Sequence, residues 1–205
     1  MFKLAQKRKE QESDAAPAQK VGLRDRLLTK EFQEAVERAP KTCKIEASNP
    51  DCLHTFNVIV TPDEGFWKGG EFVFTVYVPE EYNYSPPKCM CKTKLWHPNI
   101  AETGEICLSI LRDSSLGNGL CWLPTRSLKE VIWGINSLFT DLLNFDDPLN
   151  VQAAEMYATS RQQFETRVTR YIREYATPKP APAVEKYISL PGRPDKPSRP
   201  WDRWF

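Results

Sequence analysis

Residues 96–111 read WHPNIAETGEICLSIL, and this stretch combines a cysteine with an asparagine. Cys107 follows a turn that contains Gly104, and Asn99 lies eight residues before the cysteine. A thiolate is a strong nucleophile, and a side-chain amide can donate hydrogen bonds to an oxyanion. The pair therefore favours acyl transfer, in which the cysteine carries an acyl group as a thioester.

Each residue of this stretch also has a purely structural interpretation. Cys107 could be a buried core thiol, and Asn99 a turn residue that braces a loop, although bracing is compatible with an oxyanion role. His97 beside a cysteine and an asparagine suggests a thiol protease. The Cys-His-Asn sets of proteases are dispersed along the chain, however, and this histidine precedes Pro98 in a tight turn. We interpret His97 as a structural imidazole bonded to the backbone, and Pro98 as part of the same turn.

The amine that would attack such a thioester is a lysine, which is almost fully protonated near neutral pH. Desolvation and a nearby acceptor would help it to lose its proton. Asp146 and Asp147, in a turn after a long helical pattern, are candidates for that acceptor. A helix-flanking turn without chemical function is the alternative for both.

Composition limits the class of protein. The chain has 205 residues, a net charge of +1 and 40% hydrophobic residues, which indicates one main domain with tails. The balanced charge gives no reason to expect nucleic acid or a membrane surface as partner. No apolar run suits a signal peptide or a membrane helix. We therefore expect a cytoplasmic and/or nuclear protein.

The six cysteines are expected to be reduced, because a disulfide framework is typical of secreted chains. Cys89 and Cys91 are too close for the usual zinc knuckle, and no second ligand pair has zinc-like spacing. Apart from Cys107 we interpret the cysteines as small core residues, and we predict no metal site.

The patterns before residue 96 predict one helix and a sheet. Apolar residues at helical spacing, from Leu23 to Val36, predict a helix over 22–39 that Pro40 ends. Alternation of apolar and polar residues predicts strands with one buried face, joined in an antiparallel meander. The alternation predicts strands 53–61 and 71–78, and we expect 43–47 and 88–94 as the strands that flank them.

The patterns after residue 125 predict three helices. Ser127 and Glu130 form a capping box before a wide apolar stripe over 128–144, which predicts a helix buried on most sides. Asn150 is expected to cap a short helix to about residue 158, and Ser160 begins the last helix. Strands in a run with helices at both ends indicate an α+β fold, with residues 95–125 as an irregular segment that carries the site.

Two segments flank the expected core domain, 22–176. Residues 177–205 hold seven of the 17 prolines and end in an aromatic cluster. We interpret them as a tail with polyproline tendency. The aromatic residues either pack back on the domain or anchor a partner. These residues are Trp201, Trp204 and Phe205.

The N-terminal extension, 1–21, is polar and is expected to be flexible. Its first residues, Met1, Phe2 and Leu4, are apolar and precede a basic run, which would suit a short segment that docks on a partner. A solvated tail is the alternative. The glycine-rich piece 114–119 is expected to be a surface loop.

The motifs of the chain resemble those of the ubiquitin-conjugating enzymes. His97-Pro98-Asn99 followed by Ile106-Cys107-Leu108 resembles the signature of that family, and the resemblance covers roughly residues 22–176. Within the family the chain is most similar to the conjugating enzymes of neddylation, and among those to the F-type. Further matching motifs are Pro86-Pro87-Lys88, Trp122-x-Pro124, Asp147-Pro148-Leu149, and the longer stretches 104–109, 114–119 and 138–150.

The resemblance implies the UBC fold and an acyltransferase. Such an enzyme accepts a ubiquitin-like modifier from a heterodimeric activating enzyme as a thioester on Cys107. It then passes the modifier to a lysine, here on a cullin with a RING-type ligase. Asn99 would stabilise the oxyanion and Asp147 would sit beside the incoming lysine. No cofactor is implied, because the activating enzyme uses the ATP.

The resemblance also implies where partners bind. Tyr84, Leu123 and Pro124 correspond to positions at which RING-type ligases bind members of the family. The extension with Met1, Phe2 and Leu4 would dock on the activating enzyme, and an acetylated first methionine would bind a co-ligase. The insertion after Arg112 departs from the shorter ubiquitin-type loop. Two alternatives stay open: ubiquitin itself as the modifier, and a non-catalytic binding module of the same fold.

Overall fold

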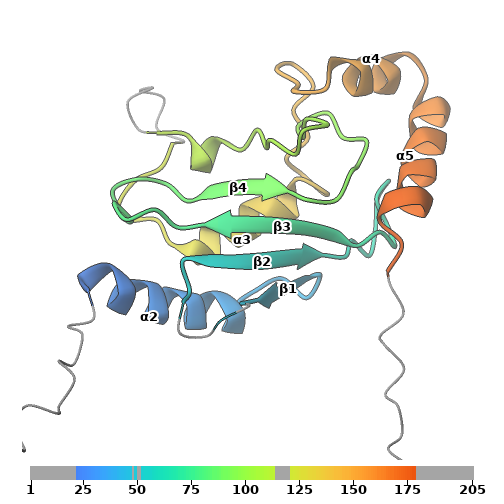
Figure 1. The fold of residues 1–205 in the computed structure, drawn as a ribbon. Helices are drawn as coiled ribbons and strands as arrows, with labels where there is room; N and C mark the ends of the chain where they lie inside the picture. Colours follow the sequence, from blue (N-terminus) through green and yellow to red (C-terminus); the bar gives the residue numbers. More distant parts are fainter. Residues whose placement is uncertain (1–21, 48, 50–51, 114–120, 179–205) are drawn as a thin grey trace, which may run out of the picture.

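A four-stranded antiparallel sheet forms the centre of the molecule in the computed structural model, which describes residues 22–47, 49, 52–113 and 121–178 (Figure 1). The strand order is β1-β2-β3-β4, so each strand pairs with its neighbour in the sequence. The predicted meander is therefore confirmed, with each strand one to three residues shorter than the predicted range. The strands are β1 (Cys43–Glu46), β2 (Thr55–Val60), β3 (Phe72–Tyr77) and β4 (Lys88–Cys91).

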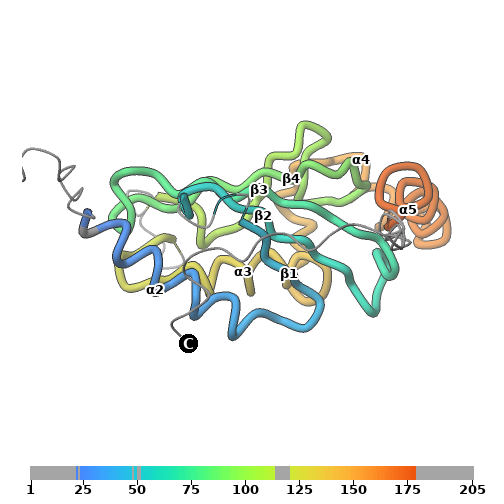
Figure 2. The backbone as a smooth tube through the Cα atoms, turned by 60° about the horizontal axis from the view of Figure 1, so that its bottom comes forward, coloured from blue at the N-terminus to red at the C-terminus, as the bar shows by residue number. Residues whose placement is uncertain are grey.

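The helices lie on one face and at one end of the sheet, as Figures 1 and 2 show. The helix α3 covers one face of the sheet, and α2 packs against α3 along the β1 side. The helices α4 and α5 lie together at one end. Their bounds are α2 (Leu23–Glu37), α3 (Leu128–Ser137), α4 (Val151–Thr159) and α5 (Arg161–Tyr175), with a short 3₁₀ helix η1 (Ser109–Leu111) after the cysteine of the central stretch.

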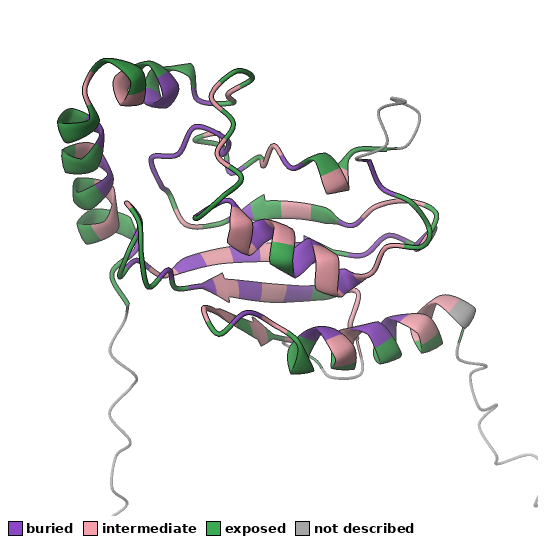
Figure 3. Cartoon of the chain, turned by 180° about the vertical axis from the view of Figure 1, so that it is seen from behind, coloured by how far each residue is buried: buried purple, intermediate pink, exposed green. Residues whose placement is uncertain are grey.

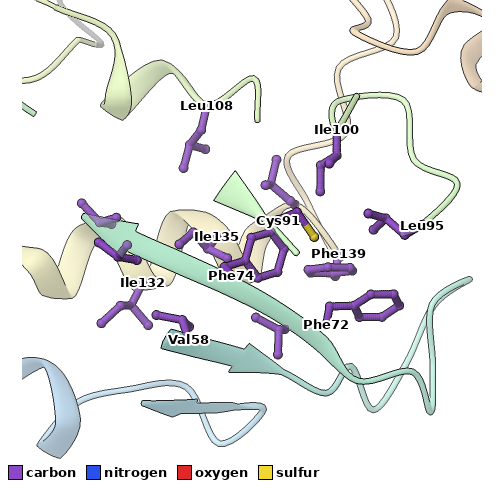
Figure 4. Packing of buried hydrophobic residues seen from close by; sticks show 14 of the residues in the cluster. Val58, Phe72, Phe74, Cys91, Leu95, Ile100, Leu108, Ile132, Ile135 and Phe139 are labelled. Atoms are coloured by element: carbon purple, nitrogen blue, oxygen red, sulfur yellow. The ribbon is translucent and has the colours of Figure 1, made fainter. Parts of the chain in front are cut away.

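The core lies between the sheet and α3. Alternate residues of β2 and β3, such as Val58 and Phe74, are fully buried and face the apolar side of α3, including Ile132 and Ile135 (Figure 4). Burying each such side chain contributes about 1.5–3 kcal/mol. Figure 3 shows the same arrangement by burial, with buried positions of α3 turned to the sheet. This α+β architecture confirms the predicted fold class.

The prediction of one long helix over 128–144 is wrong, because α3 ends at Ser137. Beyond it the N–H groups of Leu138 and Phe139 bond the carbonyls of Ile135 and Asn136, three residues back, which tightens the chain into turns. The carbonyl of Leu138 accepts a hydrogen bond from His97. His97 therefore occupies a carbonyl that the next turn of the helix would otherwise use. The apolar spacing of the sequence did not reveal this long-range contact.

Among the described side chains, the apolar stripes of α3 and α2 each include one exposed residue. In α3 this residue is Trp133, which is 49% exposed while the other residues of the helix are buried or half-buried as predicted, and its indole nitrogen donates to the carbonyl of Arg38. In α2, Val36 is 49% exposed while Ala35 is 1% exposed. The inward face of α2 includes Glu31, whose carboxylate accepts hydrogen bonds from the Tyr82 hydroxyl and the Leu128 N–H. This polar anchor orients the helix and leaves Val36 at the solvent edge.

Side-chain caps form at three helices, at the residues that the sequence predicted. Ser127 and Glu130 form both hydrogen bonds of the capping box at the start of α3. The side chain of Asn150 accepts from the N–H of Ala153 at the start of α4. At α5 the side chain of Ser160 accepts from the N–H of Gln163.

Some predicted segments lie outside the described residues. They are the extension 1–21 with Met1, Phe2 and Leu4, the insertion 114–119, and nearly all of the tail 177–205 with its aromatic cluster. Within the described part of the chain, no helix is both long enough and apolar enough to span a membrane.

Candidate active site

The segment that carries Cys107 is docked on the sheet through Gly104. The carbonyl of Gly104 accepts a hydrogen bond from the N–H of Cys91 in β4. Gly104 has a φ of +94°, and a Cβ at this position would lie 2.2 Å from the carbonyl oxygen of Cys91. Only glycine fits such a close approach. The turn seen in the sequence before the cysteine is therefore a fixed contact with β4, which sets where Cys107 lies.

Cys107 and Asn99 lie on adjacent segments. The N–H of Cys107 donates to the backbone carbonyl of Asn99 at 2.9 Å. The thiol of Cys107 is half-buried, whereas Cys91 is only 5% exposed. Burial raises the pKa of Cys91 to about 12 and the pKa of Cys43 to about 11, so these thiols are unreactive at neutral pH. The six cysteines form no disulfide.

The side chain of Asn99 is 1% exposed and braces the loop after α3. Its Nδ2 donates to the carbonyl of Asn144 at 2.6 Å, and its Oδ1 accepts from the N–H of Asn144 at 2.9 Å. Asn144 in turn accepts from the N–H groups of Asp146 and Asp147 through its own Oδ1. The amide nitrogen of Asn99 carries two hydrogens, and Asn144 takes one. A hydrogen-bond relay thus joins Asn99 to the turn with the candidate acidic residues.

His97 is fully buried, and both ring nitrogens bond the backbone. Nδ1 accepts from the N–H of Asn99 at 2.9 Å, so Nε2 carries the proton that bonds the carbonyl of Leu138 at 2.7 Å. Trp67 packs on the imidazole with ring centroids 4.5 Å apart, and its indole nitrogen donates to the carbonyl of Trp96. Burial lowers the pKa of His97 to about 4. The imidazole therefore stays neutral at working pH and offers no base to Cys107.

The pKa of His97 predicts a loss of stability in acid. The folded pKa is about 4 and the ordinary value is 6.5, so between these values the unfolded chain binds a proton that the folded chain does not. Stability is complete above pH 6.5 and falls as the pH drops towards 4, by up to about 3 kcal/mol from this residue. Denaturant unfolding of the wild type and of His97→Gln at pH 7, 6, 5 and 4 measures the effect.

The comparison between the two proteins separates this effect from the titration of carboxylates. His97→Gln is expected to be less stable at pH 7 and to lose less stability in acid than the wild type. Equal losses for the wild type and His97→Gln between pH 6.5 and 4 would contradict the assignment.

Arg112 reaches the thiol and was not singled out from the sequence. Its Nη2 lies 3.0 Å from the Sγ of Cys107 and 3.6 Å from Oδ2 of Asp147. The hydrogen bond to Cys107 and the charge of that residue raise the pKa of the Arg112 guanidinium, which stays protonated. Arg112 therefore contacts both the thiol of Cys107 and the carboxylate of Asp147, and so links the two residues. A basic residue five positions after the cysteine was the signal in the sequence, but nothing local shows where it points.

The predicted ligase-binding residues come from two loops that are joined in space. Tyr84 is 82% exposed and Leu123 is 44% exposed, and Pro124 is also exposed. Asn83 links the loops, since its side chain donates to the carbonyl of Pro124 and its carbonyl accepts from the indole nitrogen of Trp122. The three residues thus form one surface, which we name the two-loop surface.

The chain is similar to known proteins over the region that carries this site. The family described as "Ubiquitin-conjugating enzyme" matches residues 27–172. A protein of Homo sapiens named "NEDD8-conjugating enzyme UBE2F" is 55% identical over 157 residues, which are 77% of this chain and 84% of that protein. A protein of Caenorhabditis elegans named "NEDD8-conjugating enzyme ubc-12" is 46% identical over 160 residues, or 76% of this chain and 88% of that protein.

A solved structure is also similar. The structure of "S. cerevisiae Ubc12" superposes with a TM-score of 0.65 and 29% sequence identity. The match covers 82% of this chain and 87% of that chain. The similarity therefore extends across the sheet and helices that position Cys107 and Asn99, and is not confined to one motif.

Proposed function

The chain belongs to the ubiquitin-conjugating enzyme family, and we propose that it is a neddylation enzyme, which carries a ubiquitin-like modifier as a thioester on Cys107 and transfers it to a substrate lysine. The choice of a NEDD8-like modifier is supported by the similarity to proteins named NEDD8-conjugating enzymes, which are 46–55% identical. The half-buried thiol beside a guanidinium supports the chemistry.

The reaction has two acyl-transfer steps. In charging, the sulfur of Cys107 attacks the thioester of the activating enzyme, and because one thioester replaces another the step is close to thermoneutral. It needs no general base beyond a small thiolate fraction. In discharge, a lysine amine attacks the new thioester. We assign Asn99 as a donor to the oxyanion, with its second amide hydrogen, and Asp147 as the acceptor beside the incoming amine.

We extend the proposal to the partners. The two-loop surface, with Tyr84, Leu123 and Pro124, would receive a RING-type ligase, since exposed aromatic and aliphatic residues suit a binding site. The acceptor lysine would belong to a cullin. The extension with Met1, Phe2 and Leu4 would dock on the activating enzyme and a co-ligase. The reaction would take place in the cytoplasm or nucleus, where thiols stay reduced.

A charging assay tests the proposal. The purified chain is mixed with ATP and either the neddylation or the ubiquitin activating enzyme, each with its own modifier, and is run on a non-reducing gel. We expect a thiol-sensitive band with the neddylation set and only a weak one with the ubiquitin set. Charging mainly by the ubiquitin set would make ubiquitin the modifier. No band with either set, from folded protein, would indicate a binding module.

A further inference from the structure

The guanidinium of Arg112 touches the atom at which the acyl group is bound. Its Nη2 donates to the Sγ of Cys107 at 3.0 Å and lies 3.6 Å from the carboxylate of Asp147. We propose that Arg112 is a catalytic residue, which stabilises the negative charge that the sulfur of Cys107 carries when the thioester bond breaks. The inference rests on the proposed function, because it concerns the discharge of the same thioester.

The backbone around Arg112 is anchored on both sides. The N–H of Arg112 closes η1 by bonding the carbonyl of Ser109 at 3.0 Å. The carbonyl of Arg112 accepts from the N–H of Trp122 at 2.9 Å, and Trp122 is only 1% exposed. The described residues on the two sides of the insertion are thus joined by a backbone hydrogen bond. The side chain of Arg112 therefore extends towards the sulfur from an anchored backbone, which limits the entropy lost on forming the contact.

The charge at the sulfur changes during discharge. The lysine nitrogen attacks the thioester carbon and forms a C–N bond, which places a negative charge on the carbonyl oxygen. When this intermediate collapses, the C–S bond breaks and its electron pair goes to the Sγ of Cys107, which leaves as a thiolate. The amine proton passes to Asp147 or to water. Arg112 stays protonated throughout and stabilises the departing thiolate.

Arg112 interacts more strongly with the sulfur of Cys107 than with the carboxylate of Asp147. The side chain of Asp147 is 77% exposed and that of Arg112 is 43% exposed. Ion pairs so open to solvent contribute little, and this pair is longer than a hydrogen bond. The contact with the sulfur is a hydrogen bond from a cation, which is roughly twice as strong as a neutral one when the acceptor is charged. The thiolate is thus the group that Arg112 stabilises most.

Single-turnover discharge of the charged enzyme tests the role. The full chain is charged, the activating enzyme is stopped, and loss of the thioester to free lysine is followed for the wild type, Arg112→Gln and Arg112→Lys. A charge-assisted hydrogen bond that is partly open to solvent is expected to contribute about 5- to 20-fold in rate. Arg112→Gln should be slower by that factor, and Arg112→Lys should recover most of the rate because it keeps the charge.

A second attacking group distinguishes catalysis from a structural effect. Discharge to a small thiol breaks the same C–S bond, so Arg112→Gln should slow it by a similar factor. Arg38→Gln is the matched control, since Arg38 is an exposed arginine at the end of α2 that pairs with Glu34. It should discharge like the wild type. Thermal melts of all variants should coincide within a few degrees, because Arg112 is exposed.

A double-mutant cycle with Asp147→Asn decides between the two contacts of Arg112. If Arg112 acts on the sulfur, Arg112→Gln slows the Asp147→Asn enzyme by the same factor as the wild type. The proposal is overturned if that factor disappears in the Asp147→Asn background, or if Arg112→Gln discharges within twofold of the wild type. Either result leaves thioester formation by the wild type intact, and failure of the proposed function would instead appear as no thioester at all.

Discussion

Replacing Cys107 with alanine is expected to abolish the thiol-sensitive adduct with the modifier completely. The acyl group needs a nucleophilic sulfur, and the other core thiols are unsuited to replace it. Cys91 is 5% exposed, and burial raises its pKa to about 12. The measurement is the same non-reducing gel, run with the neddylation activating enzyme and its modifier.

Two further variants sharpen this test. Cys107→Ser is expected to charge slowly, because a hydroxyl is a weaker nucleophile, and to give an oxyester that survives added thiol. Cys52→Ser is the matched control. Cys52 is also half-buried, and its sulfur lies 3.0 Å from Nε2 of His54, so it is the strongest competing thiol–imidazole pair. We expect Cys52→Ser to charge like the wild type. An adduct that persists in Cys107→Ala and disappears in Cys52→Ser would show that Cys52, and not Cys107, is the nucleophile.

Replacing Asn99 with alanine is expected to slow discharge to lysine by about 10²- to 10³-fold, the loss seen when one oxyanion donor is removed. Charging should be affected much less, since exchange between two thioesters makes smaller demands on a positioned donor. Stability should also fall, by about 1–3 kcal/mol, because the N–H and carbonyl of Asn144 lose their partners. Single-turnover discharge and denaturant unfolding measure the two effects separately.

Asn144→Ala separates the oxyanion role from an effect through the turn that Asn144 holds. Asn144 holds the turn through its Oδ1, which accepts from the N–H groups of Asp146 and Asp147. Asn144→Ala therefore disturbs the turn but keeps the amide of Asn99 and its bonds to the backbone of residue 144. We expect it to discharge at least tenfold faster than Asn99→Ala. Equal rates for the two variants would show that Asn99 acts through the turn held by Asn144 and not as an oxyanion donor.

The sequence identifies some of the residues of the site but not all of them. Asn99, Cys107 and Asp147 can be selected from residue type and motif, and the structure places them around one loop and one guanidinium. Their assigned roles stay predictions. Arg112 could not be selected, because an arginine near a cysteine is usually a solvated side chain. Only the path of the chain after η1 directs its guanidinium to the sulfur.

The sequence by itself determined the features that depend on neighbours within a few residues. The alternation along β2 and β3, the capping box of Ser127 and Glu130 and the cap at Asn150 all follow from local geometry. These patterns have periods of two to four residues, so side-chain type alone reveals them. They were enough to predict the meander, the presence and starting points of the helices after residue 125, and the α+β class.

The tertiary structure alone decided the features that depend on contacts far along the chain. Leu138 meets His97 across 41 residues, and this contact accompanies the early end of α3. Asn144 meets Asn99 across 45 residues, which joins the oxyanion candidate to the acidic turn. Leu128 meets Glu31 across 97 residues, which turns Val36 outwards. No local period encodes such pairs, because each partner satisfies a buried polar group that only the assembled fold brings within reach.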